Sequence, residues 1–510
     1  MKRIREAFDR AGYTVAGVRE LLGPMAGAAL ARDEIVPALR ATGGRSALEL
    51  LTRLFWLQVP VPENALAAAE TAGDPTRDPT GDLVGDLVAA GLAERSAGEL
   101  RAALRVEPLE APQVAGRPRR HVGYVVSDLR VRPGSGASLT ADHVVGTGGA
   151  SANLAQLVVH RPVDNVLDLG TGSGVQALQL AGRPLGHRAG RPSRICATDV
   201  NPRALELTRL SFALSGAGEV ETLQGSLFEP VRDRTFDLIV SNPPFVVSPQ
   251  AAPGTPPLLT YRESGLPGDE VCRRLVTGAP DHLVMGGWGQ FLANWLHIGG
   301  ESWEERIGGW LSETGCDAWV VQREVQDPAE YAELWLRDSC ETGSPEYAAR
   351  YDAWLAHFER HRVTGIGFGW ITLRKGGQSH RIEELRHAVE QPVGGYVERV
   401  LRGLVEARLD PSLAPLRTAA GVVQEQVGPP GAEDPERIVL RQTRGLRRAA
   451  GVGTVEAALA GVCDGTLPLE PLLSAIAQLI GLSEDQVWAH AHGVLPELIA
   501  DGFFEFGDAR

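Results

Sequence analysis

The chain has few of the residues that mark metal, disulfide or membrane proteins. Its five cysteines are odd in number, scattered, and contain no Cys-x-x-Cys pair, so we expect neither a disulfide framework nor a zinc or other metal site. No apolar run approaches the roughly 20 residues that cross a bilayer. The amino terminus also lacks the apolar stretch of a signal peptide. We therefore expect a cytoplasmic protein without a membrane partner.

Basic charge is also in short supply. Lysine occurs only at Lys2 and Lys375, and 50 basic residues face 64 acidic ones, for a net charge of −14. This balance disfavours a surface that binds nucleic acid nonspecifically, although a local basic face stays open. With 43% hydrophobic and 22% charged residues, the 510-residue chain has the composition of a soluble protein of about three domains.

The apolar patterns divide the chain into three parts. Residues 1–115 carry helical spacing followed by a short extended pair, which fits a winged helix or a helical cap equally well. Residues 116–380 alternate strand and helix patterns. Residues 381–510 are mainly helical and end in a short strand, so a second winged-helix-like module is permitted. A Pro/Gly/acidic stretch at 426–435 is typical of a linker.

The central part predicts an α/β domain. Alternating strands and helices favour a doubly wound parallel sheet. Two late strands, separated by a helix-rich polar insertion at 328–362, are expected to form an antiparallel edge. The expected strands are 166–169, 194–198, 236–240, 288–292, 317–321 and 367–373.

One tetrapeptide stands out at the end of a predicted buried strand. Asn242, Pro243, Pro244 and Phe245 follow the apolar run 236–240. Proline cannot donate to a strand ladder, so the pair stops the strand in a rigid turn. Open α/β sheets bind ligands at the carboxyl ends of their strands. The turn thus presents an amide and an aromatic ring that suit a planar, amine-bearing group.

A glycine-rich turn forms the second signal. The strand 166–169 runs into Gly170, Thr171, Gly172 and Gly174, and the next strand ends at Asp199. Glycines let a backbone approach a ligand closely, and a carboxylate after the second strand can bind ribose hydroxyls. Dinucleotide dehydrogenases use a similar device, but the spacing here lacks their Gly-x-Gly-x-x-Gly pattern.

Together, in this order, the glycine turn, Asp199 and the Asn-Pro-Pro-Phe turn resemble class I S-adenosylmethionine-dependent methyltransferases of planar nitrogens. This group includes release-factor glutamine N5, ribosomal RNA guanine N2 and DNA adenine N6 enzymes. The resemblance covers residues 120–375, the "methyltransferase small" domain. It implies a Rossmann-like sheet, mostly parallel with an antiparallel edge, and it does not extend to the flanks. The apolar patterns alone predict mainly helical flanking domains, for which a winged-helix-like fold is permitted.

The resemblance also implies S-adenosyl-L-methionine as cofactor and a role for each matching residue. Asn242, Pro243, Pro244 and Phe245 would be catalytic, with Phe245 also stacking on the substrate. The cofactor would be bound by Asp168, Gly170, Thr171, Gly172, Gly174, Asp199, Val200, Ser226, Leu227 and Asn242. Many relatives have aspartate where Ser226 stands.

Two further segments are candidate ligand contacts. Backbone amides of residues 145–151, before a helix expected from Ala152, could bind the cofactor's carboxylate, and a simple capped turn is an equal alternative. Tyr261 and Arg262 follow a Pro/Ala-rich stretch and are substrate candidates on a loop that could cover the site. An ordered surface loop is the alternative.

The acceptor stays open between two patterns. Glutamine methyltransferases usually carry tyrosine where this chain has Phe245, and guanine N2 enzymes follow phenylalanine with histidine, where this chain has Val246. We expect an N-methyltransferase acting on a macromolecule, either an RNA or DNA base or a protein glutamine. The alternative is a noncatalytic or regulatory nucleic-acid-binding protein that retains the fold.

Overall fold

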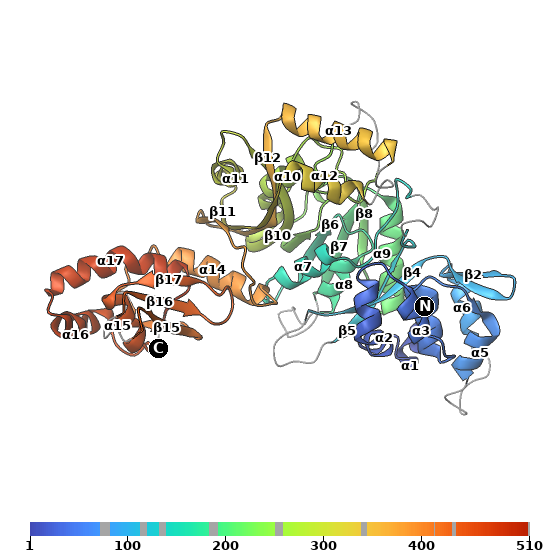
Figure 1. Ribbon diagram of the computed structural model, residues 1–510, viewed down its shortest axis with the longest axis horizontal. Helices are drawn as coiled ribbons and strands as arrows, with labels where there is room; N and C mark the ends of the chain where they lie inside the picture. The colour runs from blue at the N-terminus through green and yellow to red at the C-terminus, as the bar shows by residue number, and fades with distance from the viewer. Residues whose placement is uncertain are drawn as a thin grey trace.

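The computed structural model describes residues 1–71, 82–112, 120–131, 139–182, 192–249, 259–337, 344–412, 414–430 and 435–507. Figure 1 shows N-terminal elements in blue on one side, a central sheet in green to yellow, and C-terminal elements in orange and red on the other side. The domain boundaries at 115 and 380 stay predictions.

The central element is an eight-stranded sheet of order β13-β11-β12-β10-β9-β6-β7-β8. Its strands are β6 (Asn165–Leu169), β7 (Arg194–Asp199), β8 (Glu221–Gln224), β9 (Phe236–Ser241), β10 (Leu283–Ile298), β11 (Cys316–Gln326), β12 (Val363–Lys375) and β13 (His380–Glu384). Strands β6 to β10 pair in parallel, which confirms the predicted Rossmann-like sheet.

The antiparallel part differs from the expected edge. Strand β12 is antiparallel to both β10 and β11 and lies between them, inside the sheet. The edge is instead β13, which pairs in parallel with β11. Strand β12 is buried along most of its length, and pairing on both sides satisfies its backbone groups.

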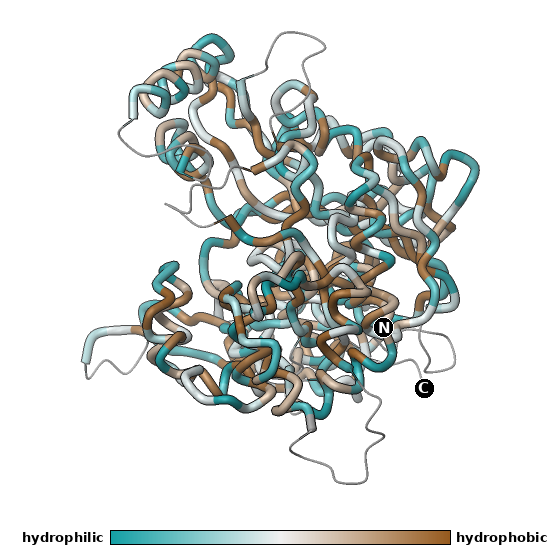
Figure 2. The backbone as a smooth tube through the Cα atoms, turned by 90° about the vertical axis from the view of Figure 1, so that its right-hand side faces the viewer, coloured by the Kyte–Doolittle hydropathy of each residue, from teal (hydrophilic) through white to brown (hydrophobic). Residues whose placement is uncertain are grey.

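Both faces of the sheet are buried, as expected for a parallel sheet covered by helices. Successive residues alternate between two cores: Val166 and Leu238 face one, and Leu167 and Ile239 face the other. Figure 2 shows hydrophobic brown segments concentrated in the interior. The helices of this part are α7 (Gly149–Leu157), α8 (Val175–Ala181), α9 (Pro202–Ser215), α10 (Glu270–Gly278), α11 (Trp303–Leu311), α12 (Pro328–Leu336) and α13 (Pro345–Arg360), with 3-10 turns at Glu229–Val231 and Ala279–His282.

The N-terminal part combines helices with a small sheet of order β1-β3-β2 and a β4-β5 hairpin. Its core continues into α9 through Ala204, Leu207 and Leu214, so this part packs directly on the central sheet's helices. The elements are α1 (Lys2–Arg10), α2 (Val15–Leu30), α3 (Val36–Ala41), α4 (Ala47–Leu51), a π-helical turn (Thr52–Trp56), β1 (Val61–Pro62), α5 (Glu63–Thr71), α6 (Leu83–Ala89), β2 (Ala93–Ser96), β3 (Glu99–Ala102), β4 (Arg105–Glu110) and β5 (His121–Ser127).

The C-terminal part contains more strand than its sequence predicts. An antiparallel strand pair, in which Val427 faces Arg437, flanks the stretch 426–435 that the sequence predicts to be a linker. The stretch therefore connects two strands of one sheet, and its residues 431–434 lie outside the described residues. Proline and glycine mark a hairpin turn as well as a linker, which explains the error. The elements are α14 (Gly394–Glu406), β14 (Leu416–Thr418), β15 (Val422–Val427), β16 (Arg437–Gln442), β17 (Ala449–Val452), α15 (Thr454–Val462), α16 (Leu469–Ile480), α17 (Glu484–Ala500) and β18 (Phe504–Phe506).

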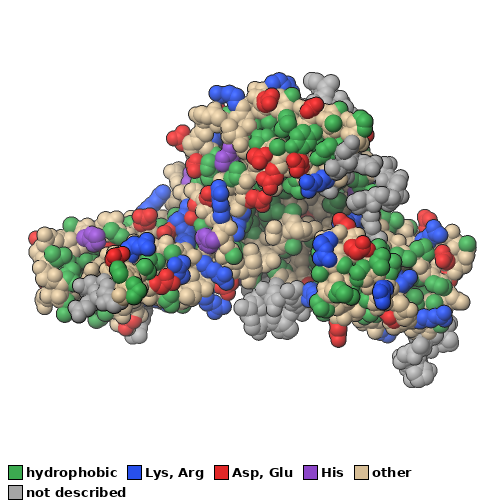
Figure 3. Space-filling view, viewed as in Figure 1, with side chains coloured by type: hydrophobic (Ala, Val, Ile, Leu, Met, Phe, Trp, Pro, Cys, Tyr) green, Lys and Arg blue, Asp and Glu red, His purple; other side chains and the backbone are tan. Residues whose placement is uncertain are grey.

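The described surface is mixed in charge. On the face shown in Figure 3, blue basic and red acidic side chains are interspersed rather than segregated. Among the described residues, no helix combines the length and hydrophobicity needed to cross a membrane.

A buried ion-pair network joins the C-terminal part to the sheet edge. The Arg448 side chain is only 7% exposed, and it donates to Asp501 Oδ1 at 2.6 Å and to Glu383 Oε1, on β13, at 2.5 Å. Arg381 on β13 pairs with the same two carboxylates. The network therefore ties β13 to the end of α17.

We predict that Arg448→Ala destabilises the C-terminal part. Removing one partner from a buried pair leaves charge uncompensated, at a cost of about 3 kcal/mol. Thermal unfolding should begin several degrees earlier, as measured by calorimetry. Arg441→Ala is the control, since Arg441 pairs with exposed Glu425 and should leave the transition unchanged. Equal melting curves for both variants would contradict the prediction.

Candidate functional site

The candidate site lies where three parallel strands end at one level. Leu169 at the end of β6 pairs with Thr198 of β7 and with Ser241 of β9. Consequently the glycine turn after β6, Asp199 at the end of β7 and Asn242 after β9 begin side by side. The Ser241 hydroxyl donates to the Leu169 carbonyl at 2.7 Å and reinforces this register.

The glycine turn has the shape of a ligand cradle. Gly170 and Gly172 have φ values of +73° and +58°, which favour glycine, and a Cβ on either would point into open space. The amides of Gly170 and Thr171 both donate to the Thr198 carbonyl at 2.9 Å. The turn is thus fixed by hydrogen bonds to the end of β7, while the space next to Gly170 and Gly172 stays open for a ligand.

Asp168 supports this turn from within. Its Oδ2 accepts hydrogen bonds from the Thr171 hydroxyl at 2.8 Å and the Ala177 amide at 3.0 Å. Burial raises the pKa of this carboxyl to about 6. These described contacts of Asp168 and Thr171 shape the loop, whereas the sequence predicts that both line the cofactor.

Asp199 links the end of β7 to the glycine turn. Its Oδ2 accepts from the Gly172 amide and its Oδ1 from the Asn201 amide, both at 2.9 Å. Burial raises the pKa of the Asp199 carboxyl above its ordinary value. Each carboxylate oxygen retains a second lone pair for a hydroxyl donor. The neighbouring Val200 is apolar yet 46% exposed, which suits an aromatic ligand group.

The predicted adenine segment follows β8. Ser226 is exposed, and its carbonyl accepts from the Glu229 amide at 3.1 Å. Leu227 has a φ of +48° and packs against the core beneath β9. The adenine contacts of these two residues stay predictions.

The segment before α7 is tied to the N-terminal part. Helix α7 begins at Gly149, three residues before the predicted Ala152, and its N-cap Gly148 offers no side-chain cap. The Thr147 amide donates to Oε2 of Glu107, at 3.0 Å, and Oε1 of this carboxylate accepts from Arg105 at 2.8 Å. Glu107 on β4 is 3% exposed, so a buried charge holds this loop in place.

The Asn-Pro-Pro-Phe turn contains an unsatisfied acceptor. Asn242 Oδ1 is buried and has no hydrogen-bond partner in the described structure. Phe245 is half-buried and packs against both cores of the sheet. Its backbone forms an isolated antiparallel β-bridge with that of Glu263. Other buried side-chain atoms of the described residues, Asn165 Oδ1 among them, also lack a partner. Asn242 Oδ1 differs from Asn165 Oδ1 in position, because it follows β9 at the level where the glycine turn begins.

The predicted substrate loop is anchored in its described part. Residues 250–258 of the Pro/Ala-rich stretch lie outside the described residues. The Arg262 side chain is 4% exposed and donates to the Trp335 carbonyl at 3.0 Å, so it supports the loop. Its predicted contact with a substrate stays a prediction. Tyr261 is partly exposed, with its ring 6.2 Å from that of His143.

Sequence reasoning missed Glu107 and Tyr331, which hold the turns from distant segments. A buried glutamate in a strand and a tyrosine in a helical insertion carry no local motif.

Among the described residues, no group of three or more His, Cys, Asp and Glu side chains could hold a metal ion.

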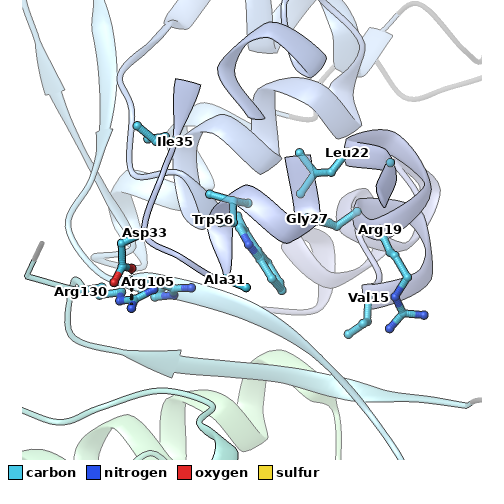
Figure 4. A pocket seen from close by; sticks show the side chains of 13 residues that line it. Val15, Arg19, Leu22, Gly27, Ala31, Asp33, Ile35, Trp56, Arg105 and Arg130 are labelled. Carbon is cyan, nitrogen blue, oxygen red and sulfur yellow. Dashed lines mark ion pairs between the residues drawn. The ribbon is translucent and has the colours of Figure 1, made fainter. Parts of the chain in front are cut away.

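A separate cavity of about 380 Å³ lies in the N-terminal part (Figure 4). Trp56 lies between α2, which carries Arg19, and the pair Arg105 and Arg130. Arg130 pairs with Asp33 at 2.7 Å. None of the predicted site residues lines this cavity, so it is distinct from the edge where the strands end.

Two family models match the chain. The model described as "Methyltransferase small domain" matches residues 147–296, and "Domain of unknown function (DUF7059)" matches residues 10–103. The first match contains the glycine turn, Asp199 and the Asn-Pro-Pro-Phe turn.

Curated relatives are similar to part of the chain. The chain is 36% identical over 163 residues to the release factor glutamine methyltransferase of Geobacter sulfurreducens, covering 31% of this chain and 53% of that protein. It is 34% identical over 146 residues to the ribosomal protein uL3 glutamine methyltransferase of Bradyrhizobium diazoefficiens, covering 27% and 44%. The chain thus spans about half the length of these relatives. A solved ribosomal protein L11 methylase from Lactobacillus delbrueckii subsp. bulgaricus aligns at 19% identity and a TM-score of 0.23, covering 44% of this chain and 77% of that one.

We predict that Glu107→Gln weakens binding of S-adenosylhomocysteine. Loss of the carboxylate's charge weakens its hydrogen bond from the Thr147 amide, and charge-assisted bonds contribute about 1.5–3 kcal/mol. The dissociation constant, measured by calorimetry, should rise by about tenfold or more. Glu110→Gln, on the same strand but paired with Arg19, is the matched control. Unchanged affinity in Glu107→Gln would show that this loop does not contribute to the site.

Proposed function

We propose that this chain, a class I S-adenosylmethionine-dependent methyltransferase of the Asn-Pro-Pro-Phe group by its domain at residues 147–296, methylates the amide nitrogen of a protein glutamine. Relatives named as glutamine methyltransferases of a release factor and of ribosomal protein uL3 support a protein acceptor over RNA or DNA. The substrate would therefore be a polypeptide whose glutamine side chain reaches the edge of the sheet.

The observation that carries this proposal is the unpaired Oδ1 of Asn242. A buried hydrogen-bond acceptor without a donor costs about 1–3 kcal/mol. The NH₂ group of a bound substrate amide would donate to Asn242 Oδ1 and remove that cost. Phe245, at the other end of the same turn, offers a ring face on which a planar amide can stack. Both groups recognise a flat nitrogen.

The remaining residues fit the cofactor. Gly170, Gly172 and Gly174 would hold its methionine part, and Asp199 would accept from the ribose hydroxyls. Val200, with Ser226 and Leu227, would lie against the adenine. Bound S-adenosylmethionine would supply an electrophilic methyl group on a positively charged sulfur, with S-adenosylhomocysteine as the leaving group and water as the acceptor of the proton that the nitrogen loses.

The chain's own contribution is activation and positioning. An amide nitrogen is a poor nucleophile because its lone pair is delocalised into the carbonyl. Asn242 Oδ1 and the Pro243 carbonyl would accept its two N–H groups and draw the nitrogen out of conjugation. The two prolines keep both acceptors in a fixed direction. Correct placement of the nitrogen then supplies most of the rate, without a dedicated general base.

We predict that Asn242→Ala abolishes transfer but not folding. Loss of one preorganised hydrogen-bonding group at a reacting centre lowers kcat by about 100-fold or more. The assay incubates labelled S-adenosylmethionine with an extract from cells that lack this protein and scores label in protein, RNA and DNA separately. Label is expected in protein. Circular dichroism and S-adenosylhomocysteine binding should match the wild type.

Asn165→Ala is the control for that assay. Asn165 begins β6, at the amino end of the strand and away from the candidate site, and its side-chain Nδ2 donates to the Thr235 carbonyl at 2.7 Å. This variant should transfer methyl groups at the wild-type rate. Full activity in Asn242→Ala would remove the proposed role of the turn. Label in RNA or DNA would contradict the protein acceptor, and no label in any fraction would favour a noncatalytic binding protein.

A further inference from the structure

The insertion between β11 and β12 lies on the side of the sheet where the carboxyl ends of the strands form the candidate site. Strand β12 is antiparallel to both β10 and β11, so β10 and β11 run in the same direction. The carboxyl end of β11 therefore meets those of β9 and β10. Helices α12 and α13 leave from this end and form a layer above the sheet in Figure 1.

Tyr331 on α12 reaches from this insertion to the chain just beyond the Asn-Pro-Pro-Phe turn. Its hydroxyl oxygen accepts from the Val247 amide at 3.0 Å and from Asn294 Nδ2 at 3.2 Å. The side chain is fully buried, and burial raises the pKa of the hydroxyl well above its ordinary value. The hydroxyl stays neutral and offers its oxygen to both donors.

An aromatic cluster fixes the Tyr331 ring. Trp354 and Phe358 on α13 lie with ring centroids at 6.0 and 6.1 Å, and Phe368 on β12 lies at 5.6 Å. Val246 and Val247 belong to the same buried cluster. The position of the hydroxyl is thus set by packing on two helices and a strand, and it has little freedom to follow a moving loop.

A second contact holds the neighbouring residue. The Val246 amide donates to the Arg262 carbonyl at 2.9 Å, and the Arg262 guanidinium donates to the Trp335 carbonyl at the end of α12. Both residues that follow Phe245 are therefore attached to α12, one directly and one through Arg262. The glycine turn and Asp199 have no described hydrogen bond with this insertion.

We propose that Tyr331 is a positioning residue for methyl transfer, which holds the turn so that Asn242 and Phe245 keep one orientation toward the acceptor. This inference rests on the proposed function. It assigns the α12–α13 insertion to the acceptor side of the site, because its contacts reach the turn and not the cofactor cradle.

The test compares Tyr331→Phe with Tyr351→Phe in the full-length protein. Tyr351 lies on α13 of the same insertion, and its hydroxyl donates to Glu333 at 3.2 Å, away from the turn. In Tyr331→Phe, hydrogen exchange of peptides spanning residues 242–249 should accelerate by about tenfold, as expected for loss of one hydrogen bond. S-adenosylhomocysteine affinity should stay within about twofold, whereas kcat for labelled methyl transfer should fall by about tenfold with the KM for S-adenosylmethionine unchanged. Tyr351→Phe should match the wild type in all four measurements.

A second variant guards against a folding defect in the first. Arg262→Met loosens the same segment through Val246 and should give the same pattern of faster exchange, retained cofactor affinity and lower kcat. Unchanged exchange over residues 242–249 in both variants, or a parallel loss of S-adenosylhomocysteine affinity, would overturn the inference. Hydrogen exchange and S-adenosylhomocysteine binding can be measured without turnover. If the wild-type protein methylates nothing, the proposed function is refuted. The hydrogen-exchange result then still decides whether Tyr331 holds the turn.

Discussion

The register of β6 with its two neighbours is the constraint on which the site depends. Leu169, Thr198 and Ser241 share one level of the sheet, and the glycine turn, Asp199 and the Asn-Pro-Pro-Phe turn follow directly after it. A slip of one residue would turn each strand's side chains to the opposite face. The two apolar cores prevent that slip, because alternate residues of β6 and β9 are buried on both faces.

Buried polar groups transmit this order to the turns. Asp168 and Asp199 each accept one hydrogen bond from the glycine turn and one from a neighbouring amide, although burial raises the pKa of both carboxyls. Glu107 and Tyr331 act in the same way from outside the matched domain, on the loop before α7 and on the segment after Phe245. Among the residues at the ends of the three strands, Asn242 has a buried side-chain oxygen without a described partner, whereas Asp168 and Asp199 accept hydrogen bonds.

Much of the central domain could be predicted from local patterns. Short apolar runs ended by glycine, aspartate or proline gave β6, β7 and β9 to within a residue, and the order of the motifs indicated the family. The sequence patterns gave a wrong structure where the same local composition is compatible with two different structures. The stretch 426–435 connects two paired strands of one sheet and not two domains. Arg262, which is polar enough for a surface, is buried against a carbonyl of α12. Strand β12 entered the interior of the sheet because pairing order depends on contacts far apart in the chain.

The sequence by itself determined the chemistry on offer: flexible glycines after one strand, a carboxylate after the next, and an amide and a ring on a proline-stiffened turn after a third. Each is a local property of residue type and spacing. Only the tertiary structure decided that the Asp168 carboxylate contacts its own loop, that Glu107 and Tyr331 hold the loops on either side, and that Asn242 lacks a partner. Those outcomes depend on which distant groups share a low-dielectric interior, where an unpaired polar atom is costly, and local sequence does not encode that neighbourhood.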